Sequence, residues 1–239
     1  MIRVGGGLDR AVAGVGGEEA AWEVGAGLPT PVLARRTAKA GLGGVHRLIG
    51  VPGTVGGGVF MNAGAHGQDF SQVVRAVDLL QADGTLRHVP AGEIAWRYRG
   101  AGLDGTVIVA ATIELIPGDP EQLLKEIRQH LRWRQAGTPF NEACCGSVFR
   151  NPAAATPSGA DGGAGAEGAE LRTAGQLIDA AGLKGFRIGG AQVSPKHANY
   201  IVNTGEATAK DVLAVIDAVR ERVSKEFGVE LELEVRIIG

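Results

Sequence analysis

"LIGVPGTVGGGVFMNAGAHGQ", residues 48–68, is a run of 21 residues with seven glycines and no Asp, Glu, Lys or Arg. A membrane-spanning helix needs about 20 apolar residues. Pro52, Asn62, His66 and the glycines argue against one here, since each glycine costs roughly 1 kcal/mol of helix stability relative to alanine. Glycine is favoured where the backbone takes a positive φ or approaches another group closely, and successive bare amides can then point at a ligand's oxygens. The glycine content allows two interpretations, a loop that cradles a ligand or a tight-turn region between packed strands.

The composition indicates a protein with balanced charge and room for a substantial core. Its 239 residues can form one large domain or two modest ones. The 24 basic and 26 acidic residues give a net charge of −2, which provides no general field for nucleic acid or an anionic membrane. Cys144 and Cys145 are adjacent, a spacing that suits neither a loop-closing disulfide nor a zinc site. With no signal-peptide pattern at the start, we expect a protein of the reducing cytoplasm.

Residues 1–117 predict a strand-rich domain that contains one helix. Alternating runs around Gly16 and around Gly84 indicate two antiparallel hairpins, the second with Asp-Gly as a favoured two-residue turn. Residues 30–44 have helical spacing, with Thr30 as a possible cap. Residues 106–117, "TVIVAATIELIP", indicate a buried strand.

Residues 118–239 predict helices packed on a sheet, so we place a domain boundary near Gly118. One helix is expected after Pro120, another around residues 171–182, and a third between a capping box at Thr208 and a stop at Gly228. The small residues of 152–170 predict a flexible loop. Strict alternation over residues 229–237 predicts a final strand. The expected fold class is therefore α+β.

Taken singly, the polar residues of the chain indicate no particular chemistry. The five histidines, His197 among them, lack the spacing of metal ligands and are expected to be surface or packing residues. Ser147 lies outside the G-x-S-x-G frame of a hydrolase elbow. By pattern alone, Glu234 belongs to a solvated strand face and Arg99 to the surface. Because the histidines lack metal-ligand spacing, we expect no metal site.

Several segments together resemble one family. They are "IGVPGTVGGGVFMNAGAHG", "YRGAG", "CCGSVFRNP", "AGLKGFRIGGAQVSPKHANYIVN" with the later "ATAKDV", and "ELEVRIIG". In wording, order and spacing they are similar to the UDP-N-acetylenolpyruvoylglucosamine reductases, which are UDP-N-acetylmuramate dehydrogenases. The resemblance covers nearly the whole chain except the small-residue loop.

The resemblance implies an FAD-binding domain over residues 1–117 and a substrate-binding domain over residues 118–239. It also implies a cytoplasmic flavoprotein oxidoreductase of peptidoglycan synthesis, and so of cell wall biogenesis, cell shape and cell division. NADPH would reduce FAD, and the flavin would pass hydride to the enolpyruvyl group of UDP-N-acetylglucosamine enolpyruvate, giving UDP-N-acetylmuramate. The partner is then a small UDP-sugar, with neither nucleic acid nor membrane.

The resemblance also implies roles for individual residues. Adding hydride to an enolpyruvyl carbon leaves enolate charge beside a carboxylate, and this charge must be stabilised and then quenched by a proton. By position, Ser147 resembles the proton donor, Arg99 the group that neutralises carboxylate charge, and Glu234 a second acid or orienting group. The residues expected along FAD are Gly53, Thr54, Val55, Gly56 and Asn62. Those expected to hold the diphosphate or uridine are Arg134, Asn151, Lys184 and Lys196.

Departures from the family pattern leave alternatives open. Ala101 and Leu103 replace the usual serine and phenylalanine after Arg99, His66 replaces a tyrosine, and Thr138 replaces a glutamine. Family members normally carry a further glycine loop before the segment matched by the start of this chain, so the flavin domain is expected to be N-terminally incomplete. A catalytically silent nucleotide-sugar binding remnant is the alternative function. An oxidase of a related flavin fold is disfavoured, because the second half also resembles the reductases.

Overall fold

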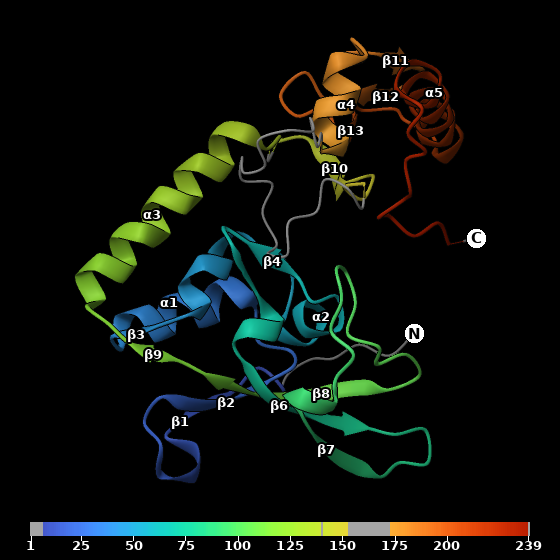
Figure 1. Cartoon of the computed structure of the whole chain (residues 1–239). Coiled ribbons are helices and arrows are strands. Elements are labelled where there is room, and N and C mark those ends of the chain that lie inside the picture. The colour runs from blue at the N-terminus through green and yellow to red at the C-terminus, as the bar shows by residue number, and fades with distance from the viewer. Residues whose placement is uncertain (1–6, 140, 153–172, 239) are drawn as a thin grey trace. The chain divides into compact units, whose positions relative to one another are not determined.

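The computed structural model of the chain describes residues 7–139, 141–152 and 173–238 (Figure 1). Contacts divide the chain into two compact units, the first ending at Arg132 and the second beginning at Trp133. The change of unit falls inside helix α3 (Pro120–Gly137), because Leu123 and Ile127 belong to the first core. The boundary near Gly118 concerns where flavin binding ends and substrate binding begins, and it stays a prediction.

The first unit is built on an antiparallel sheet with strand order β1-β2-β8-β6-β7. Its strands are β1 (Ala11–Ala13), β2 (Ala21–Gly25), β3 (Leu42–Gly43), β4 (Gly64–Ala65), β5 (Gln68–Asp69), β6 (Val74–Leu80), β7 (Leu86–Pro90), β8 (Val107–Glu114) and β9 (Ile116–Pro117). Its helices are α1 (Thr30–Lys39), α2 (Val55–Phe60) and most of α3, with short 3-10 turns at Val15–Gly17, Val45–Gly50, Phe70–Gln72 and Ala91–Glu93. The short strands pair outside the main sheet, β3 with β9 and β4 with β5.

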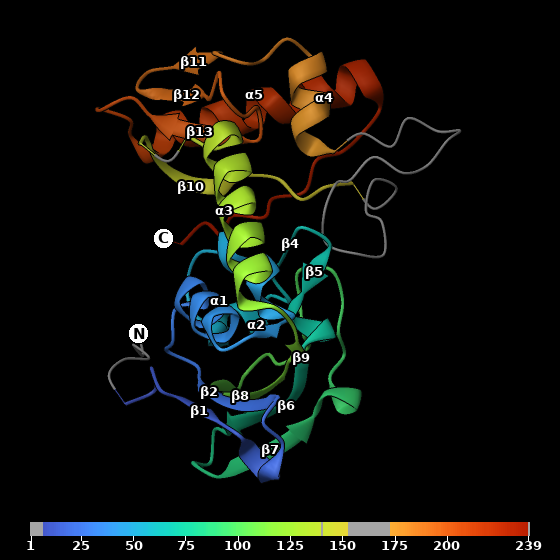
Figure 2. The ribbon, with the colours of Figure 1, turned by 90° about the vertical axis from the view of Figure 1, so that its left-hand side faces the viewer.

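Helices α1 and α2 lie on the same side of the five-stranded sheet (Figures 1 and 2). Side chains from both helices and from the strands form one core, among them Leu33, Val55, Phe70 and Ile113, all fully buried. At about 25 cal/mol per Å² of apolar surface, such burial is the main stabilising term of the unit.

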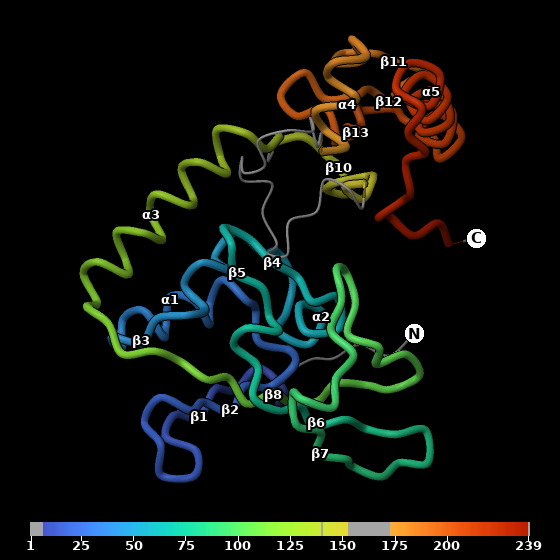
Figure 3. The backbone as a smooth tube through the Cα atoms, in the orientation of Figure 1, coloured from blue at the N-terminus to red at the C-terminus, as the bar shows by residue number. Residues whose placement is uncertain are grey.

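The two predicted hairpins form as β1–β2 and β6–β7, but the second turn differs from the prediction (Figure 3). A two-residue turn of the type that Asp-Gly favours needs positive φ at both central residues. Only Gly84 of the pair has one, at 85°. Asp83 instead accepts hydrogen bonds from the Thr85 amide and hydroxyl, at 2.9 and 2.7 Å, and the ladder closes with a bond from Gln81 N to Thr85 O. The predicted cap of α1 is also wrong, since the cap is Pro29.

The second unit has a sheet with strand order β10-β13-β12-β11, and all its pairs are antiparallel. Its elements are β10 (Ala143–Ser147), α4 (Ala174–Ala180), β11 (Arg187–Ile188), β12 (Ala191–Val193), β13 (Tyr200–Asn203) and α5 (Ala209–Phe227). Helices α4 and α5 and the sheet share one core, in which α5 buries Val215, Ile216, Val219 and Val223. The mixed helix and sheet content of both units confirms the α+β class.

Local signals at the ends of α4 and α5 match the structure. The capping box of α5 forms between Thr208 and Asp211, and Gly228 ends the helix with a φ of 67°. Helix α4 is capped in the same way by Thr173 and Gln176. The predicted flexible loop over residues 152–170 lies, apart from Pro152, outside the described residues.

The prediction of a final strand over residues 229–237 is wrong. Burial alternates as expected from Val229 to Leu233, but one bridge, Phe149 to Leu233, is the ladder contact that forms. Beyond it, Ile237 and Ile238 are exposed. Alternation of apolar residues specifies which side chains turn inward, but a strand also requires a partner whose amides continue the ladder.

Within the described ranges, none of the helices combines the length and apolar character that crossing a membrane requires. The same residues contain no group of His, Cys, Asp or Glu side chains placed to hold a metal ion.

Candidate active site

The glycines of the 48–68 stretch permit close packing of α2. A Cβ on Gly58 would lie 2.2 Å from Cε2 of Phe70, and one on Gly56 would lie 2.7 Å from Cβ of Ala26. The amides of Val55 and Gly56 donate to the carbonyls of Leu28 and Ala26 at 2.8 and 2.9 Å. These amides are therefore used within the protein, which supports the tight-packing interpretation for this side of the stretch.

The opposite side of the same stretch is open. Thr54, Gly56, Gly57 and Phe60 line a hollow of about 180 Å³. The remaining lining residues are Ala26, Thr106, Val107 and Ile108. Among the residues that the structure describes, a Cβ on Gly57 would meet nothing nearer than the Thr54 hydroxyl at 3.8 Å, and one on Gly53, whose φ is 91°, would meet nothing within 4 Å. Backbone without side chains thus faces free space here, as a cradle for a flat or phosphorylated ligand requires.

Some of the residues predicted to contact FAD line this hollow, and others do not. Thr54 and Gly56 line the hollow, whereas the side chain of Val55 is fully buried in the core. Thr54 also caps α2, because its hydroxyl accepts from the Gly57 amide at 3.4 Å. Asn62 is buried and lies outside the lining set. The glycine stretch therefore packs with one side and presents bare backbone with the other.

Asn62 connects the glycine stretch to the turn that carries Arg99. Its side-chain amide donates to the carbonyl of Arg97 at 3.3 Å, and its side-chain oxygen accepts from the Ser71 amide at 2.9 Å. Arg97 and Gly100 exchange two backbone hydrogen bonds, so Tyr98 and Arg99 form the tip of a tight turn. The turn that presents Arg99 is thus fixed to the end of the glycine stretch.

Arg99 has an unusual backbone conformation. Its φ is 56°, a region that side chains other than glycine, Asn and Asp rarely adopt. Its guanidinium carbon lies 4.8 Å from the centre of the Tyr98 ring, and the side chain is half-buried. Ala101, where the family usually has a serine, is buried. Strained residues of this kind cluster at functional sites, where the surrounding contacts hold them.

Ser147 stands at the end of β10, directly after a bulge. Cys144 pairs with Val202 and Ser147 with Tyr200, so two residues of β10 lie opposite one of β13. Gly146 supplies the bend with a φ of 87°. Bulges re-aim the side chain that follows them. Ser147 is half-buried at this position.

Asn199 holds the segment that follows Ser147. Its side chain accepts from the Phe149 amide at 2.9 Å and donates to the Phe149 carbonyl at 2.8 Å. Its own carbonyl accepts from the Val148 amide at 2.9 Å. Asn199 is buried, so these bonds are shielded from water.

Glu234 reaches the same segment from the end of the chain. Its amide donates to the carbonyl of Val148 at 2.8 Å, which places the backbones of Glu234 and Ser147 on neighbouring segments. Glu230 and Glu232 are exposed, whereas Glu234 is half-buried. Glu234 is therefore less exposed than the other two glutamates with which the alternating pattern had grouped it.

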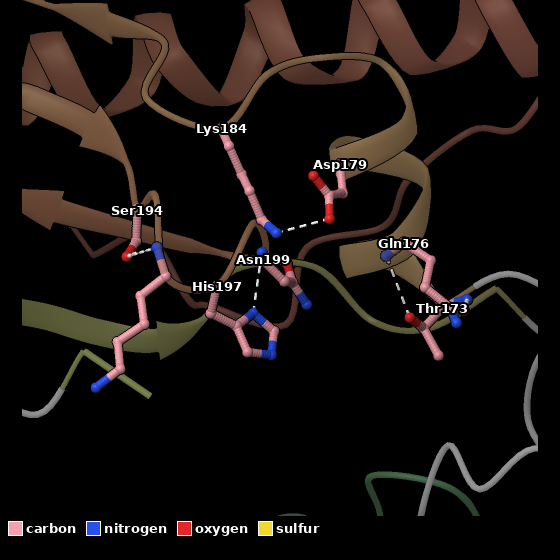
Figure 4. A network of polar contacts seen from close by, with 8 residues as sticks. Thr173, Gln176, Asp179, Lys184, Ser194, His197 and Asn199 are labelled. Atoms are coloured by element: carbon pink, nitrogen blue, oxygen red, sulfur yellow. Dashed lines mark hydrogen bonds and ion pairs between the residues drawn. The ribbon is translucent and has the colours of Figure 1, made fainter. Parts of the chain in front are cut away.

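Several cations of the second unit lie near His197, and Figure 4 shows one of them, Lys184, with its partner Asp179. Lys184 forms an ion pair with Asp179 at 2.6 Å, and Lys196 donates to the carbonyl of Gln135 at 2.7 Å. Arg134 is in the last turn of α3, one residue before that carbonyl. The charges of Lys184 and Arg134 both act on His197, whose pKa is lowered first by burial and then by these two cations. Three of the predicted substrate residues thus share one neighbourhood.

Asn151, the fourth predicted substrate residue, has a structural contact. Its side-chain oxygen accepts from the amide of Ala174 at 3.1 Å, at the start of α4. This places it between the strand segment after Ser147 and the helix that carries Asp179.

Neither Asn199 nor His197 was expected at this site from the sequence. Both lie in "SPKHANYIV", residues 194–202, where one asparagine interrupts an apolar run. A polar residue inside a buried pattern is the signal that could have identified Asn199, because buried amides are retained where they are hydrogen-bonded.

Comparisons with known proteins give one family match in each of the two units of the chain. Residues 1–90 match a family described as FAD binding domain, and residues 138–238 match UDP-N-acetylenolpyruvoylglucosamine reductase, C-terminal domain. The UDP-N-acetylenolpyruvoylglucosamine reductase of Halalkalibacterium halodurans is 44% identical over 90% of this chain and 67% of its own length. UDP-N-acetylenolpyruvoylglucosamine reductase 1 of Bacillus anthracis is 38% identical over 100% of this chain and 73% of its own.

A solved structure is also similar. The crystal structure of UDP-N-acetylenolpyruvylglucosamine reductase (MurB) from Thermus caldophilus superposes with a TM-score of 0.73 at 34% identity, covering 90% of this chain and 71% of that one. The chain spans about two thirds of the length of the curated relatives it matches. On this evidence the chain belongs to the UDP-N-acetylenolpyruvoylglucosamine reductase family.

Proposed function

We propose that this protein is a cytoplasmic flavoenzyme that uses NADPH to reduce the enolpyruvyl group of UDP-N-acetylglucosamine enolpyruvate, giving UDP-N-acetylmuramate for peptidoglycan synthesis. The observation that carries the proposal is the neighbourhood of Ser147 and Glu234, in the same unit as Arg134, Lys184 and Lys196. An acid pair and a group of cations are what a substrate with an enolpyruvyl carbon and a diphosphate demands.

The hollow beside α2 suits a flavin nucleotide. Gly53 and Gly57 leave backbone exposed to free space, and Thr54 and Gly56 line it. FAD, when bound, supplies the hydride that NADPH delivers to it. The protein would hold the cofactor along the open side of the glycine stretch, with Phe60 and Ile108 as apolar contacts.

Ser147 and Glu234 have the chemistry to handle the proton. When hydride reaches the enolpyruvyl carbon, the neighbouring carbon becomes carbanionic and must receive a proton. Ser147 donates that proton from its hydroxyl, and the bulge at Gly146 sets the direction of the side chain. Glu234 is half-buried beside the same segment. It acts either as a second acid or as a group that orients the serine or the substrate.

Arg99 counters the negative charge that grows on the enolate and its carboxylate. A guanidinium is permanently charged and can bond a carboxylate with two parallel N–H groups. Tyr98 stacks against it, and Asn62 fixes the turn from which it projects. Arg134, Lys184, Lys196 and Asn151 bind the diphosphate or uridine of the substrate.

The proposal is tested by steady-state turnover. Flavin-loaded protein is supplied with NADPH and UDP-N-acetylglucosamine enolpyruvate, NADPH loss is followed by absorbance, and the product is identified by mass. One UDP-N-acetylmuramate per NADPH is expected. Flavin-loaded, folded protein without turnover rejects the reductase. Colourless protein that still binds the UDP-sugar supports the binding remnant instead.

A further inference from the structure

His197 is held in one orientation and one tautomer. Its Nδ1 atom accepts a hydrogen bond from the Asn199 amide at 3.2 Å, so in the neutral ring the proton resides on Nε2 (Figure 4). The Tyr200 ring packs edge-on at 4.7 Å between centroids. Gly175 makes room for the imidazole, because a Cβ there would lie 3.4 Å from Cε1 of His197. The ring is therefore preorganised with a donor at its far end.

The surroundings of that donor are positively charged. Lys184 and Arg134 are close enough to lower the pKa of His197 in addition to the effect of burial. Asp179 is the carboxylate that pairs with Lys184. Lys196, one residue before the histidine, reaches the end of α3 through Gln135. The cationic groups of Lys184, Lys196 and Arg134 therefore gather around the histidine, and an anion is attracted to such a group.

Nε2 of His197 has no bonding partner among the described residues, although the ring is half-buried. A half-buried donor among cations suits a phosphate oxygen, which accepts from neutral imidazole and from ammonium or guanidinium groups alike. A uracil carbonyl could use the donor, but it carries no net charge and would gain less from the neighbouring cations than a phosphate oxygen does.

We propose that His197 is a substrate-binding residue that donates its Nε2–H to the diphosphate of the UDP-sugar, in a subsite shared with Lys184 and Arg134. The inference rests on the proposed function for the identity of the ligand. It adds a contact whose geometry depends on Asn199, the residue that also holds the segment after Ser147. Diphosphate binding and the placement of Ser147 thus share one support.

Two substitutions separate the two ends of the ring. In His197→Asn, the side-chain oxygen can accept from the Asn199 amide as Nδ1 does, but the far donor is lost. In His197→Gln, the longer amide can place an N–H where Nε2 lies, but the bond to Asn199 is lost. The pair distinguishes ligand binding from support of the loop.

The measurement is calorimetric binding of UDP and of uridine to flavin-loaded protein. His197→Asn should weaken UDP binding by roughly tenfold to a hundredfold, as for loss of a hydrogen bond to a charged group. Its uridine affinity should stay unchanged, and His197→Gln should keep most of the UDP affinity. Equal UDP binding by His197→Asn and wild type overturns the inference. An equal loss for UDP and uridine also overturns it, because that pattern reports loop disorder.

The wild-type protein provides a test that needs no variant. The titration of His197 is followed by NMR with and without UDP. The bound diphosphate should raise the pKa of His197, since it opposes the charges of Lys184 and Arg134, while uridine should leave it unchanged. An unaltered titration in saturating UDP contradicts the proposal. If UDP binds in this way but the enolpyruvyl substrate is not turned over, the proposed reaction fails and the diphosphate subsite stands.

Discussion

At the scale of single residues, the position of Ser147 is set by its neighbours in sequence and in space. Gly146 adopts a φ of 87° and β10 bulges against β13, so the serine leaves the regular alternation of the strand. Partial burial of the sulfur raises the pKa of the neighbouring Cys145 thiol, which makes it a weak nucleophile although the residue as a whole is exposed. Ser147 is half-buried and follows the bulge, and its hydroxyl is the group to which we assign the proton transfer.

The role of Ser147 can be isolated by removing its hydroxyl. In Ser147→Ala, NADPH should still reduce the bound flavin, while reoxidation by the enolpyruvyl substrate slows by two or more orders of magnitude, as for loss of a general acid. Stopped-flow absorbance of the flavin measures both half-reactions. Ser224→Ala, a half-buried serine on α5, serves as the control and should leave both rates unchanged. A parallel fall in both half-reactions would assign Ser147 another role.

Asn199 and Asn203 form a matched pair for the energetics of the second unit. Asn199 is buried and makes two side-chain bonds to Phe149, whereas the exposed Asn203 accepts from the amides of Gly205 and Ala207. Asn199→Ala should destabilise the unit by about 2–4 kcal/mol, because it leaves two buried backbone groups unpaired, and Asn203→Ala by about 1 kcal/mol or less.

Urea unfolding, read by hydrogen exchange across residues 143–150, measures the difference. Equal losses for the two asparagine variants would show that the Asn199–Phe149 bonds add nothing beyond those of a surface turn.

At the scale of elements, α2 shows how one short helix serves both packing and binding. Gly58 faces Phe70, and Gly57 faces the hollow. Replacing each with alanine should have opposite consequences, since overpacking a core costs about 1–3 kcal/mol, whereas alanine in an unobstructed helical position gains about 0.5–1 kcal/mol over glycine.

Gly58→Ala is expected to lower the thermal stability of the first unit. Gly57→Ala is expected to keep or raise that stability but to weaken FAD binding roughly tenfold to a hundredfold, because its methyl group enters the hollow beside Thr54. Calorimetric melting and flavin titration provide the readouts. If Gly57→Ala binds FAD as tightly as wild type, the cofactor does not lie against this side of α2.

How far the sequence predicts each element depends on how local its cause is. The ends of α5 were predicted because Thr208, Asp211 and Gly228 act within one turn of the helix. The final strand was mispredicted because the alternation of residues 229–237 contains no information about its partner, and the segment after β10 provides one bridge, at Phe149. The turn at Gly84 differs because Asp83 bonds to Thr85.

Part of the candidate site could be predicted from the sequence. The composition of the glycine stretch indicated a possible ligand loop, and Ser147, Arg99 and Glu234 were assigned from the resemblance to the family. Asn199 could not be assigned from local pattern, since its partner Phe149 lies 50 residues away in sequence. His197 acquires its significance from Lys184 and Arg134, which are also distant along the chain.

At the scale of the whole molecule, two histidines make stability sensitive to acid. The pKa of His197 is lowered by burial and by Lys184 and Arg134, and that of His130 is lowered by burial and by the neighbouring His46. Between the lowered pKa and the ordinary value near 6.5, the unfolded chain binds more protons than the folded one. Stability should therefore fall as the pH drops through and below about 6.5.

Unfolding free energies at pH 7.5 and 5.5 would check this sensitivity. His130→Phe retains a ring to stack on His66, which lies 3.9 Å from the His130 ring, and should reduce the loss of stability on acidification. A loss of the same size in this variant and in the wild type would remove His130 as a cause.

In the proposed reaction, reducing equivalents pass from NADPH through a bound flavin to an enolpyruvyl UDP-sugar. An anaerobic experiment observes the two steps in turn: the flavin-loaded protein is first reduced with one equivalent of NADPH and then mixed with UDP-N-acetylglucosamine enolpyruvate. We predict that the flavin absorbance returns as one equivalent of UDP-N-acetylmuramate appears. A flavin that stays reduced in saturating substrate, with the protein folded and the UDP-sugar bound, would contradict the account.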